Sequence, residues 1–314
     1  MANKPFCDEV TFSLLPKEVF PLWFSDVSDF EVVKNHSRVV YRVSADGECY
    51  YLKIMPDSRV EDGWFPNKEK FELAADFTRH LAGKGAPVAR PIVSKNDGYI
   101  EEYKFDDVYM LVQVTAEVPG KTVSEACKEP AVYERCGIAL AKLHNASDSF
   151  AQISRYEKDD WERQWIQTGT EIPDGDEMLQ SEYENVSDWL QSSCPLPGGK
   201  GLIHGDTNIL NFMDDKNHVS IIDVDNAEFT WYAVDLANPF RHRNEDISHE
   251  ERYDLWTAFN SGYCSHRFID LNYETITWLL RLWSLDTYVM YIPYGRNKEW
   301  MERLLRFIKN PKKW

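Results

Sequence analysis

Residues 201–228, GLIHGDTNILNFMDDKNHVSIIDVDNAE, constrain the fold more than any other stretch of the chain. They set His204, Asp206 and Asn211 in an H-x-D-x-x-x-x-N spacing, and they place Asp223 at the end of an apolar run. Phosphoryl transfer needs such a set, because a carboxylate orients the attacking hydroxyl and oxygen ligands hold Mg²⁺ against the nucleotide phosphates. The pattern therefore indicates a kinase.

Apolar runs beside these residues predict short buried strands. Residues 202–203 lead into the polar loop, residues 209–213 leave it, and residues 219–222 form a further strand that delivers Asp223 at its end. This arrangement brings three oxygen ligands together within a short length of chain. It predicts a site for a metal ion and phosphate groups.

The first part of the chain has the pattern of an antiparallel sheet with one inserted helix. Runs of β-forming residues predict strands at 30–33, 39–43, 49–55, 91–94 and 109–114. Helical apolar spacing covers residues 67–84, and Gly85 and Pro87 end it. A charged turn separates the last two predicted strands.

After Pro119 and Gly120 the pattern becomes helical. Helices are predicted within 134–144, 157–193 and 247–309, with loops at 168–177 and 194–200. The sequence thus predicts an α+β fold with two lobes. A small β-rich lobe covers residues 1–114, a strap covers 115–118, and a larger, mainly helical lobe covers 119–314.

Composition limits the location and the partners. The N-terminus lacks a signal peptide, and no apolar stretch approaches the ~20 residues of a membrane-spanning helix, so we expect a cytoplasmic protein without a membrane partner. The net charge of −17, from 35 Lys and Arg against 52 Asp and Glu, argues against nucleic acid. Such a charge would attract a cationic substrate. The alternative is that the acidic surface only keeps the protein soluble. The oligomeric state is not predicted.

The cysteines indicate no metal or redox motif. All six stand singly, at positions 7, 49, 127, 136, 194 and 264. Without a C-x-x-C pair, a zinc ribbon or a dithiol site is not expected. We expect buried free thiols in a reducing compartment.

The order and spacing of these motifs resemble the aminoglycoside phosphotransferase and choline kinase superfamily, relatives of the eukaryotic protein kinases, over roughly residues 30–310. The resemblance implies a bilobal, protein-kinase-like fold with an ATP site between the lobes. It also implies transfer of the γ-phosphoryl group to a hydroxyl of a small molecule. GTP is not excluded as the donor.

The resemblance also implies roles for individual residues. Asp206 resembles the catalytic base, and Asn211 and Asp223 resemble the Mg²⁺ ligands. His204 is then a structural member of the loop. Residues 143–144 match the family's "LH" helix end, and 234–237 match its "D-[LI]-A" signature, in which Asp235 braces the catalytic loop.

Asp225 is a further candidate. Alternation along a strand would place Asp223 and Asp225 on one face, so that Asp225 binds a second ion or contacts the substrate. The alternative is a carboxylate that faces solvent or caps a turn.

Lys53 lies on the third predicted strand, where the family places the lysine that binds the α and β phosphates. The alternative is an exposed strand lysine. Glu72 and Glu69 lie one turn apart on the following helix, and either could pair with Lys53. Glu72 is favoured because it lies nearer the helix centre.

The expected phosphate-covering loop departs from the family pattern. Residues 35–37 join the first two strands without a glycine, although the Ser37 hydroxyl could face phosphate. The strap Gln113–Glu117, including Thr115, is expected to offer main-chain groups to adenine.

Residues 157–188 carry eleven acidic residues against Lys158 and Arg163. In similar kinases this insertion forms a wall of the acceptor pocket, and a cationic amine such as an aminoglycoside or a choline-like compound would suit it. The alternative is a set of solvated helix faces.

Three other functions stay open. A protein Ser/Thr kinase of the bacterial stress-response kind would need a shallow acceptor groove. A nucleotide-binding pseudokinase would explain the loop without glycine. A metal hydrolase would need His204, Asp206, His218 and Asp223 to converge on one ion.

Overall fold

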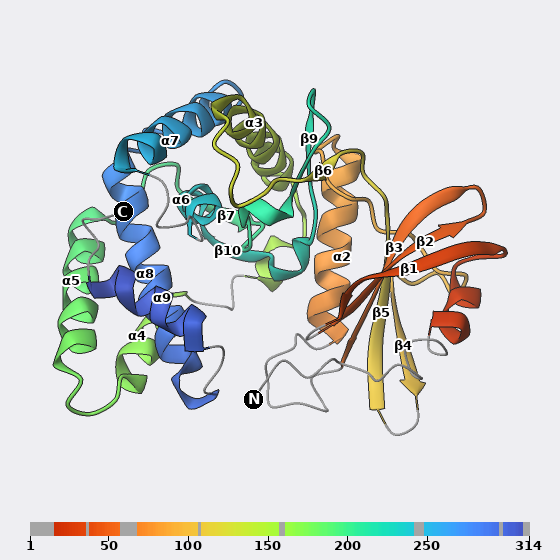
Figure 1. Cartoon of the computed structure of the whole chain (residues 1–314), viewed down its shortest axis with the longest axis horizontal. Helices are drawn as coiled ribbons and strands as arrows, with labels where there is room; N and C mark the ends of the chain where they lie inside the picture. The colour runs from red at the N-terminus through yellow and green to blue at the C-terminus, as the bar shows by residue number, and fades with distance from the viewer. Residues whose placement is uncertain are drawn as a thin grey trace. The chain divides into compact units, whose positions relative to one another are not determined.

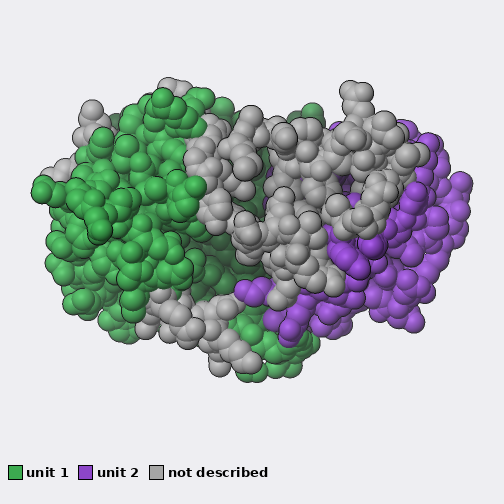
Figure 2. All heavy atoms as spheres, turned by 90° about the horizontal axis from the view of Figure 1, so that it is seen from below, with its two compact units in different colours: residues 1–2, 85–87, 119–314 green, residues 3–84, 88–118 purple. Residues whose placement is uncertain are grey.

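The structure, a computed structural model, describes residues 16–35, 38–56, 68–105, 108–156, 161–241, 248–294 and 298–309. The chain divides into two compact units, which Figure 2 shows in two colours. The N-terminal unit comprises residues 3–84 and 88–118, and the C-terminal unit comprises residues 1–2, 85–87 and 119–314.

The N-terminal unit is built on a five-stranded antiparallel sheet, with helix α2 inserted after its third strand (Figure 1). In spatial order its strands are β1 (Val27–Asn35), β2 (Val39–Ala45), β3 (Glu48–Pro56), β5 (Val108–Ala116) and β4 (Ile100–Phe105). The inserted helix is α2 (Lys68–Gly83). The predicted helix and first three strands are therefore present, with boundaries shifted by a few residues.

The predicted strand at 91–94 is wrong. Pro91 makes a single bridge with Thr115, while the fifth strand of the sheet is β4, in the stretch predicted as a charged turn. A proline lacks the N–H that a continuous ladder requires. An edge strand tolerates the charged residues of β4 because it pairs on one side only. Ile100 at its start is buried, which fits a strand covered on one face.

The two faces of this sheet are covered by different elements. Val19, Phe20, Trp23 and Phe24, around the 3-10 turn η1 (Phe20–Leu22), pack with buried residues of β2, β3 and β5 on one face. On the other face, Met55 and Leu111 pack with Phe71 and Ala75 of α2. Because strand residues alternate, Lys53 lies on the same face as Met55.

The C-terminal unit is mainly helical. Its helices are α3 (Pro130–Ser147), α4 (Trp161–Glu171), α5 (Glu177–Ser193), α6 (Tyr232–Ala237), α7 (His249–Cys264), α8 (Tyr273–Tyr291) and α9 (Lys298–Lys309). Several of them begin where the sequence supplies a cap: the side chains of Asp176, Ser248 and Asn272 accept hydrogen bonds from the first turns of α5, α7 and α8. None of the described helices is long and apolar enough to cross a membrane.

Two small sheets interrupt these helices. One has the order β6 (Lys121–Thr122), β8 (Phe212–Asp214), β9 (Val219–Ile221), and the other pairs β7 (Lys200–Ile203) with β10 (Glu228–Trp231). Two predictions need correction. Residues 209–211 form a 3-10 turn rather than a strand, and residues 168–171 belong to α4, so the loop before α5 is shorter than predicted.

The described cysteines are free thiols, and Cys136 is the buried one among them. The prediction of free thiols is correct for Cys49, Cys127, Cys136, Cys194 and Cys264. The prediction of burial fails for four of these five, which are partly exposed.

Helices α3 and α7 lie side by side and cross at two glycines (Figure 1). A Cβ on Gly137 of α3 would overlap the carbonyl oxygen of Phe259 in α7. A Cβ on Gly262 of α7 would overlap the carbonyl oxygen of Glu134 in α3. The two backbones therefore approach so closely that neither position has room for a side chain.

Gly137→Ala should destabilise the protein, because the added methyl meets main-chain atoms that cannot rotate away. Overpacking of this kind costs about 1–3 kcal/mol. The matched control is Gly83→Ala, at the end of α2, where no atom lies within 4 Å of the new Cβ. Thermal unfolding should show a lower Tm for Gly137→Ala and no loss for Gly83→Ala. Equal Tm values would contradict this account of the helix crossing.

Candidate active site

The loop after β7 turns on Gly205. Its φ is +79°, a conformation that favours glycine, and a Cβ there would overlap the carbonyl oxygen of Asn226. The glycine of the H-G-D sequence is thus required by the backbone. It lets the chain reverse between the buried strand end at Ile203 and the carboxylate of Asp206.

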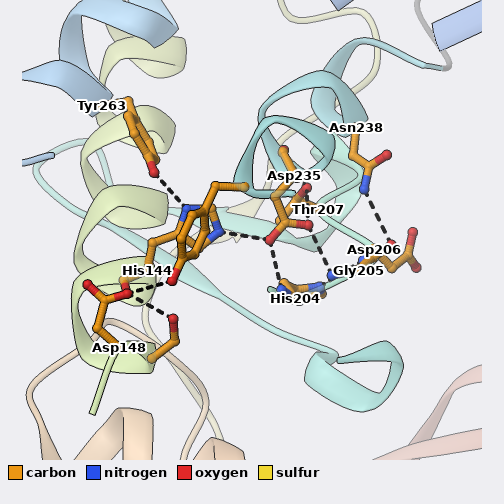
Figure 3. Close-up of polar contacts among 11 residues, drawn as sticks. His144, Asp148, His204, Gly205, Asp206, Thr207, Asp235, Asn238 and Tyr263 are labelled. Carbon is orange, nitrogen blue, oxygen red and sulfur yellow. Dashed lines mark hydrogen bonds and ion pairs between the residues drawn. The ribbon is translucent and has the colours of Figure 1, made fainter. Parts of the chain in front are cut away.

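The buried carboxylate of Asp235, from α6, holds this loop (Figure 3). It accepts hydrogen bonds from the main-chain N–H of His204 at 2.7 Å and of Gly205 at 3.0 Å. The Thr207 hydroxyl donates to the main-chain oxygen of Asp235 at 2.7 Å. Asp235 is fully buried, and the donors around it compensate for the loss of solvent.

His144, at the end of α3, is the third group bonded to this carboxylate. Its Nε2 lies 3.0 Å from Asp235 Oδ2, and its Nδ1 lies 2.8 Å from the Tyr263 hydroxyl of α7 (Figure 3). A neutral imidazole meets both contacts, with Nε2–H donating to Asp235 and Nδ1 accepting from Tyr263. Burial lowers the pKa of His144, against the opposing effect of Asp235. Burial would raise the pKa of Asp235, but the bonds from His144 and His204 keep it below its usual value.

His204 ties Asp206 to the segment that leads to Asp223. Its Nδ1 accepts from the Asp206 N–H at 3.1 Å, and its Nε2 lies 3.0 Å from the carbonyl oxygen of Ile222, to which it donates. The side chain is fully buried. Both ring nitrogens are therefore engaged in holding the backbone.

Asn211 lies at the end of the 3-10 turn η3 (Ile209–Asn211). Its Nδ2 donates to the main-chain oxygen of Asp206 at 2.7 Å and lies 3.4 Å from Asp206 Oδ2. The Ile222 N–H donates to the Asn211 main-chain oxygen at 2.9 Å. The amide nitrogen of Asn211 is thus committed to the loop, which leaves its Oδ1 as the possible metal ligand.

The strand argument for Asp223 and Asp225 is wrong. Strand β9 ends at Ile221, Asp223 has a φ of +68°, and residues Val224–Asn226 form a 3-10 turn, η4. Alternation along a strand therefore cannot place the two carboxylates on one face. Asp223 lies two residues beyond the end of β9, which is shorter than predicted, and Asp225 belongs to the following turn.

The metal hydrolase is not supported. In the part of the chain that the structure describes, no group of three or more His, Cys, Asp and Glu side chains could hold a metal ion. The cause is visible at His204, whose two nitrogens bond to the main chain. His218 lies exposed in the turn before β9.

Arg241 contacts the carboxylate of Asp206 and was not anticipated from the sequence. An ion pair joins its Nη2 to Asp206 Oδ1, and its guanidinium carbon lies 4.9 Å from the centre of the Trp283 ring. Arg241 comes 35 residues after Asp206, but it lies six residues after Asp235 on a helical backbone, and that spacing is the signal that could have marked it.

In the N-terminal unit, the predicted nucleotide-binding residues lie on neighbouring strands. Lys53 stands opposite Gln113 and Tyr51 stands opposite Thr115 in the β3–β5 pairing, so these four residues share one face of the sheet. Gln113 is buried. Ser37 lies outside the described residues.

The choice between Glu72 and Glu69 as the partner of Lys53 stays a prediction. Glu72 lies 3.8 Å from Lys68, one turn earlier in α2, and both side chains are about half exposed.

Sequence reasoning also missed an ion pair at the strap. Arg42 Nε and Nη2 donate to the two Glu117 carboxylate oxygens at 2.7 and 3.1 Å, which lowers the pKa of Glu117.

The described acidic residues of the stretch 157–188 differ in how far their side chains are buried. Glu182 is buried and paired with Arg281 of α8 at 2.7 and 2.8 Å, so it neutralises its own partner. Five other acids are exposed, as solvated helix faces would be: Glu171, Asp174, Glu177, Glu184 and Asp188. On α8, Asp286 accepts from the Thr168 hydroxyl of α4 at 2.5 Å, and burial raises its pKa.

Comparison with known proteins places the chain in a family. Residues 31–269 match the family described as "Phosphotransferase enzyme family" (APH), so the chain belongs to the phosphotransferase enzyme family. The predicted class, a phosphotransferase, and the predicted resemblance to aminoglycoside phosphotransferases are confirmed.

A characterised relative is amicoumacin kinase of Bacillus subtilis (strain 168), 21% identical over 201 residues, which cover 63% of this chain. The match spans 58% of that relative's length.

Solved structures share the fold at low identity. An amicoumacin kinase in complex with AMP-PNP and Ca²⁺ has a TM-score of 0.75 and 19% identity over 98% of this chain and 93% of its own. A microcompartment-associated aminopropanol kinase has a TM-score of 0.72 and 16% identity over 95% of each chain. A GDP complex of aminoglycoside 2'-phosphotransferase-IIIa has a TM-score of 0.64 and 15% identity over 98% of this chain and 99% of its own. The kinase-like α+β fold is thus confirmed.

The stability of the protein should fall as the pH is lowered from 7.5 to 5.5. Because the pKa of His144 is lowered in the folded protein, the unfolded chain binds more protons below about pH 6.5. One such group changes the unfolding free energy by at most about 1.4 kcal/mol per pH unit. Asp235, whose folded pKa is also lowered, adds a loss at still lower pH.

Urea unfolding of His144→Gln at several pH values checks this. A glutamine can donate to Asp235 and accept from Tyr263 without titrating, so the variant should be less stable and its stability should depend less on pH. His218→Gln, which changes an exposed histidine, is the control and should keep the wild-type slope. An unchanged slope in His144→Gln would show that this group is not responsible.

Proposed function

We propose that this phosphotransferase transfers the γ-phosphoryl group of ATP, with Mg²⁺, to a hydroxyl of a small, amine-bearing acceptor. The geometry of the loop after β7 carries the proposal. Asp235 and His204 hold the main chain up to the Asp206 N–H, and Asn211 Nδ2 holds the Asp206 carbonyl oxygen. The Asp206 side chain is 23% exposed and therefore within reach of an acceptor.

In this proposal Asp206 is the catalytic base. Its carboxylate accepts a hydrogen bond from the acceptor hydroxyl and directs the oxygen toward the phosphorus. The proton passes to the carboxylate late, because a loose transition state needs little deprotonation beforehand. His204 and Asp235 act on the backbone and keep this carboxylate in one place.

Asn211 and Asp223 are the proposed Mg²⁺ ligands, and their chemistry fits that ion. Asn211 Oδ1 remains available because Nδ2 bonds to the main chain, and Asp223 contributes an anionic oxygen after β9. Mg²⁺ in kinases commonly uses one or two protein carboxylates and completes its shell with phosphates and water. When bound, the ion neutralises charge on the phosphates. Asp225 is a further ligand or a substrate contact in this proposal.

Residues 1–114 form the proposed nucleotide-binding lobe, residues 115–118 the proposed hinge, and residues 119–314 the proposed catalytic lobe. Lys53 would bind the α and β phosphates with Glu72 as its partner, and Ser37 would assist. Gln113 and Thr115 lie on the strand that leads into the hinge and would contact the base. GTP stays open as an alternative donor, since one structural neighbour holds GDP.

The amine on the acceptor is supported by the names of the relatives. They act on amicoumacin, aminopropanol and aminoglycosides, as their names state. A net charge of −17 attracts cations to the protein and would raise their local concentration at low ionic strength.

Asp206→Asn should lower kcat at least about 100-fold, because an amide cannot take the hydroxyl proton. The Kd for nucleotide should stay near the wild-type value. Asp254→Asn, on the exposed side of α7, is the matched control and should keep full activity. The assay is Mg²⁺-dependent nucleotide turnover against amino alcohols, amino sugars, neutral sugars and a generic protein acceptor. Full activity of Asp206→Asn would remove the proposed base, and turnover with the protein acceptor alone would favour a protein kinase.

Lys53→Met should weaken nucleotide binding about tenfold or more, since about 1.4 kcal/mol of lost attraction corresponds to a factor of ten. The exposed Lys84, just after α2, provides the control Lys84→Met with the same change in net charge. Titration of a fluorescent ATP analogue gives both Kd values. Equal values for the two variants would mean that Lys53 does not bind phosphate.

A further inference from the structure

A single short segment contacts the loop that carries Asp206 at three points. Asp235 bonds to the main-chain N–H groups of His204 and Gly205. Asn238 Nδ2 donates to the Gly205 carbonyl oxygen at 3.3 Å, as Figure 3 shows. Arg241 then forms an ion pair with the Asp206 carboxylate itself.

The three contacting residues, Asp235, Asn238 and Arg241, follow one another at intervals of three along a helical backbone, which brings them to one side of the segment. Helix α6 ends at Ala237 and the 3-10 turn η5 (Asn238–Phe240) follows directly. Phe240 is fully buried and packs against the rings of Tyr133, Trp256 and Phe259. The aromatic core of the unit thus anchors the residue next to Arg241.

Asp206 and Arg241 differ in their exposure to solvent. The side chain of Asp206 is 23% exposed, whereas that of Arg241 is 9% exposed. Of the two side chains, Asp206 is therefore the more accessible to an acceptor. The Arg241 Nε is buried and has no hydrogen-bond partner among the described residues.

A buried guanidinium requires an anion. Burial lowers the pKa of Arg241 to about 10, so the group is still charged at neutral pH. Its ion pair with Asp206 supplies the compensating charge, and the Trp283 ring, 4.9 Å from the guanidinium carbon, limits its movement. Arg241 is thus both charged and held in place.

We propose that Arg241 is a positioning residue for phosphoryl transfer: its guanidinium holds Oδ1 of Asp206 and thereby presents Oδ2 to the acceptor hydroxyl. Among the residues that the structure describes, Oδ2 receives only the long 3.4 Å contact from Asn211 Nδ2, so it keeps the capacity to accept a strong hydrogen bond. The inference rests on the proposed function, because it assigns Asp206 as the base.

The ion pair has a consequence for acceptor recognition. Since the charge of Asp206 is already compensated by Arg241, this carboxylate is not the group that binds the ammonium of an amine-bearing acceptor. Without the guanidinium, an ammonium can pair with Asp206 and hold the acceptor in an unproductive pose. Loss of Arg241 should therefore lower kcat without raising the acceptor KM.

The test compares Arg241→Met and Arg241→Lys with the matched control Arg281→Met. Arg281 is similarly buried, bonds to a carboxylate, Glu182, and lies 3.8 Å from the Trp278 ring, but its partner is not Asp206. The assay follows ATP·Mg²⁺ turnover with aminopropanol, with an aminoglycoside, and with water as the acceptor. Hydrolysis to water makes the result independent of the acceptor's identity.

We expect Arg241→Met to lower kcat about 10- to 100-fold, the size of effect that a misplaced catalytic group produces. The nucleotide KM should stay unchanged and the acceptor KM should not rise. Arg241→Lys should recover at least part of kcat, and Arg281→Met should keep kcat within about twofold of the wild type. Where Arg241→Met does not fold, Trp283→Leu removes the ring beside the guanidinium and should lower kcat in the same direction.

Several results would overturn the inference. An unchanged kcat in Arg241→Met would do so, as would a fall in kcat in Arg281→Met equal to that in Arg241→Met. An Arg241→Lys variant no more active than Arg241→Met would also contradict it. Where Trp283→Leu replaces an unfolded Arg241→Met, an unchanged kcat in Trp283→Leu would have the same meaning. Wild-type protein without turnover under any condition would overturn the proposed function and the inference together. Wild-type turnover that Asp206→Asn loses and Arg241→Met keeps would overturn the inference alone.

Discussion

The arrangement of the candidate site depends on one buried carboxylate. Asp235 has no contact with solvent, so its charge must be compensated by donors inside the protein. Two of those donors are consecutive main-chain N–H groups, at His204 and Gly205. Removing the carboxylate would leave each without its partner, at about 1–3 kcal/mol per buried group. The position of Asp206, the next residue, therefore follows from the burial of Asp235.

Helices α3 and α7 supply further hydrogen-bonding groups of this network. His144 comes from α3 and Tyr263 from α7, and their side chains meet because the two helices approach at Gly137 and Gly262. Helix packing is therefore linked through His144 to Asp235 and from there to the loop. A small change in the spacing of α3 and α7 would move a hydrogen bond to the carboxylate that holds the loop.

Asp235 and Arg241 hold the loop through different atoms. Asp235 acts on the main chain of the loop, whereas Arg241 contacts the carboxylate of Asp206 directly. Both belong to one seven-residue stretch, Asp235–Arg241, whose course is set by α6, the following 3-10 turn and the burial of Phe240. Because one segment bonds to the main chain of the loop and to the Asp206 side chain, the carboxylate has a defined position and a defined orientation.

The sequence by itself determined the features that depend on local spacing. The α+β class, the helix inserted after the third strand, the family, and the segment holding His204, Asp206, Asn211 and Asp223 all follow from patterns within a few dozen residues. The tertiary structure decided the rest. The strand is at 100–105 rather than 91–94 because pairing with β5 is non-local, and the turn at Val224–Asn226 removes the alternation expected for Asp225. The contact of Arg241 with Asp206 exists because the helical segment that begins with α6 packs against the loop after β7, and the sequence does not say which loop that segment meets.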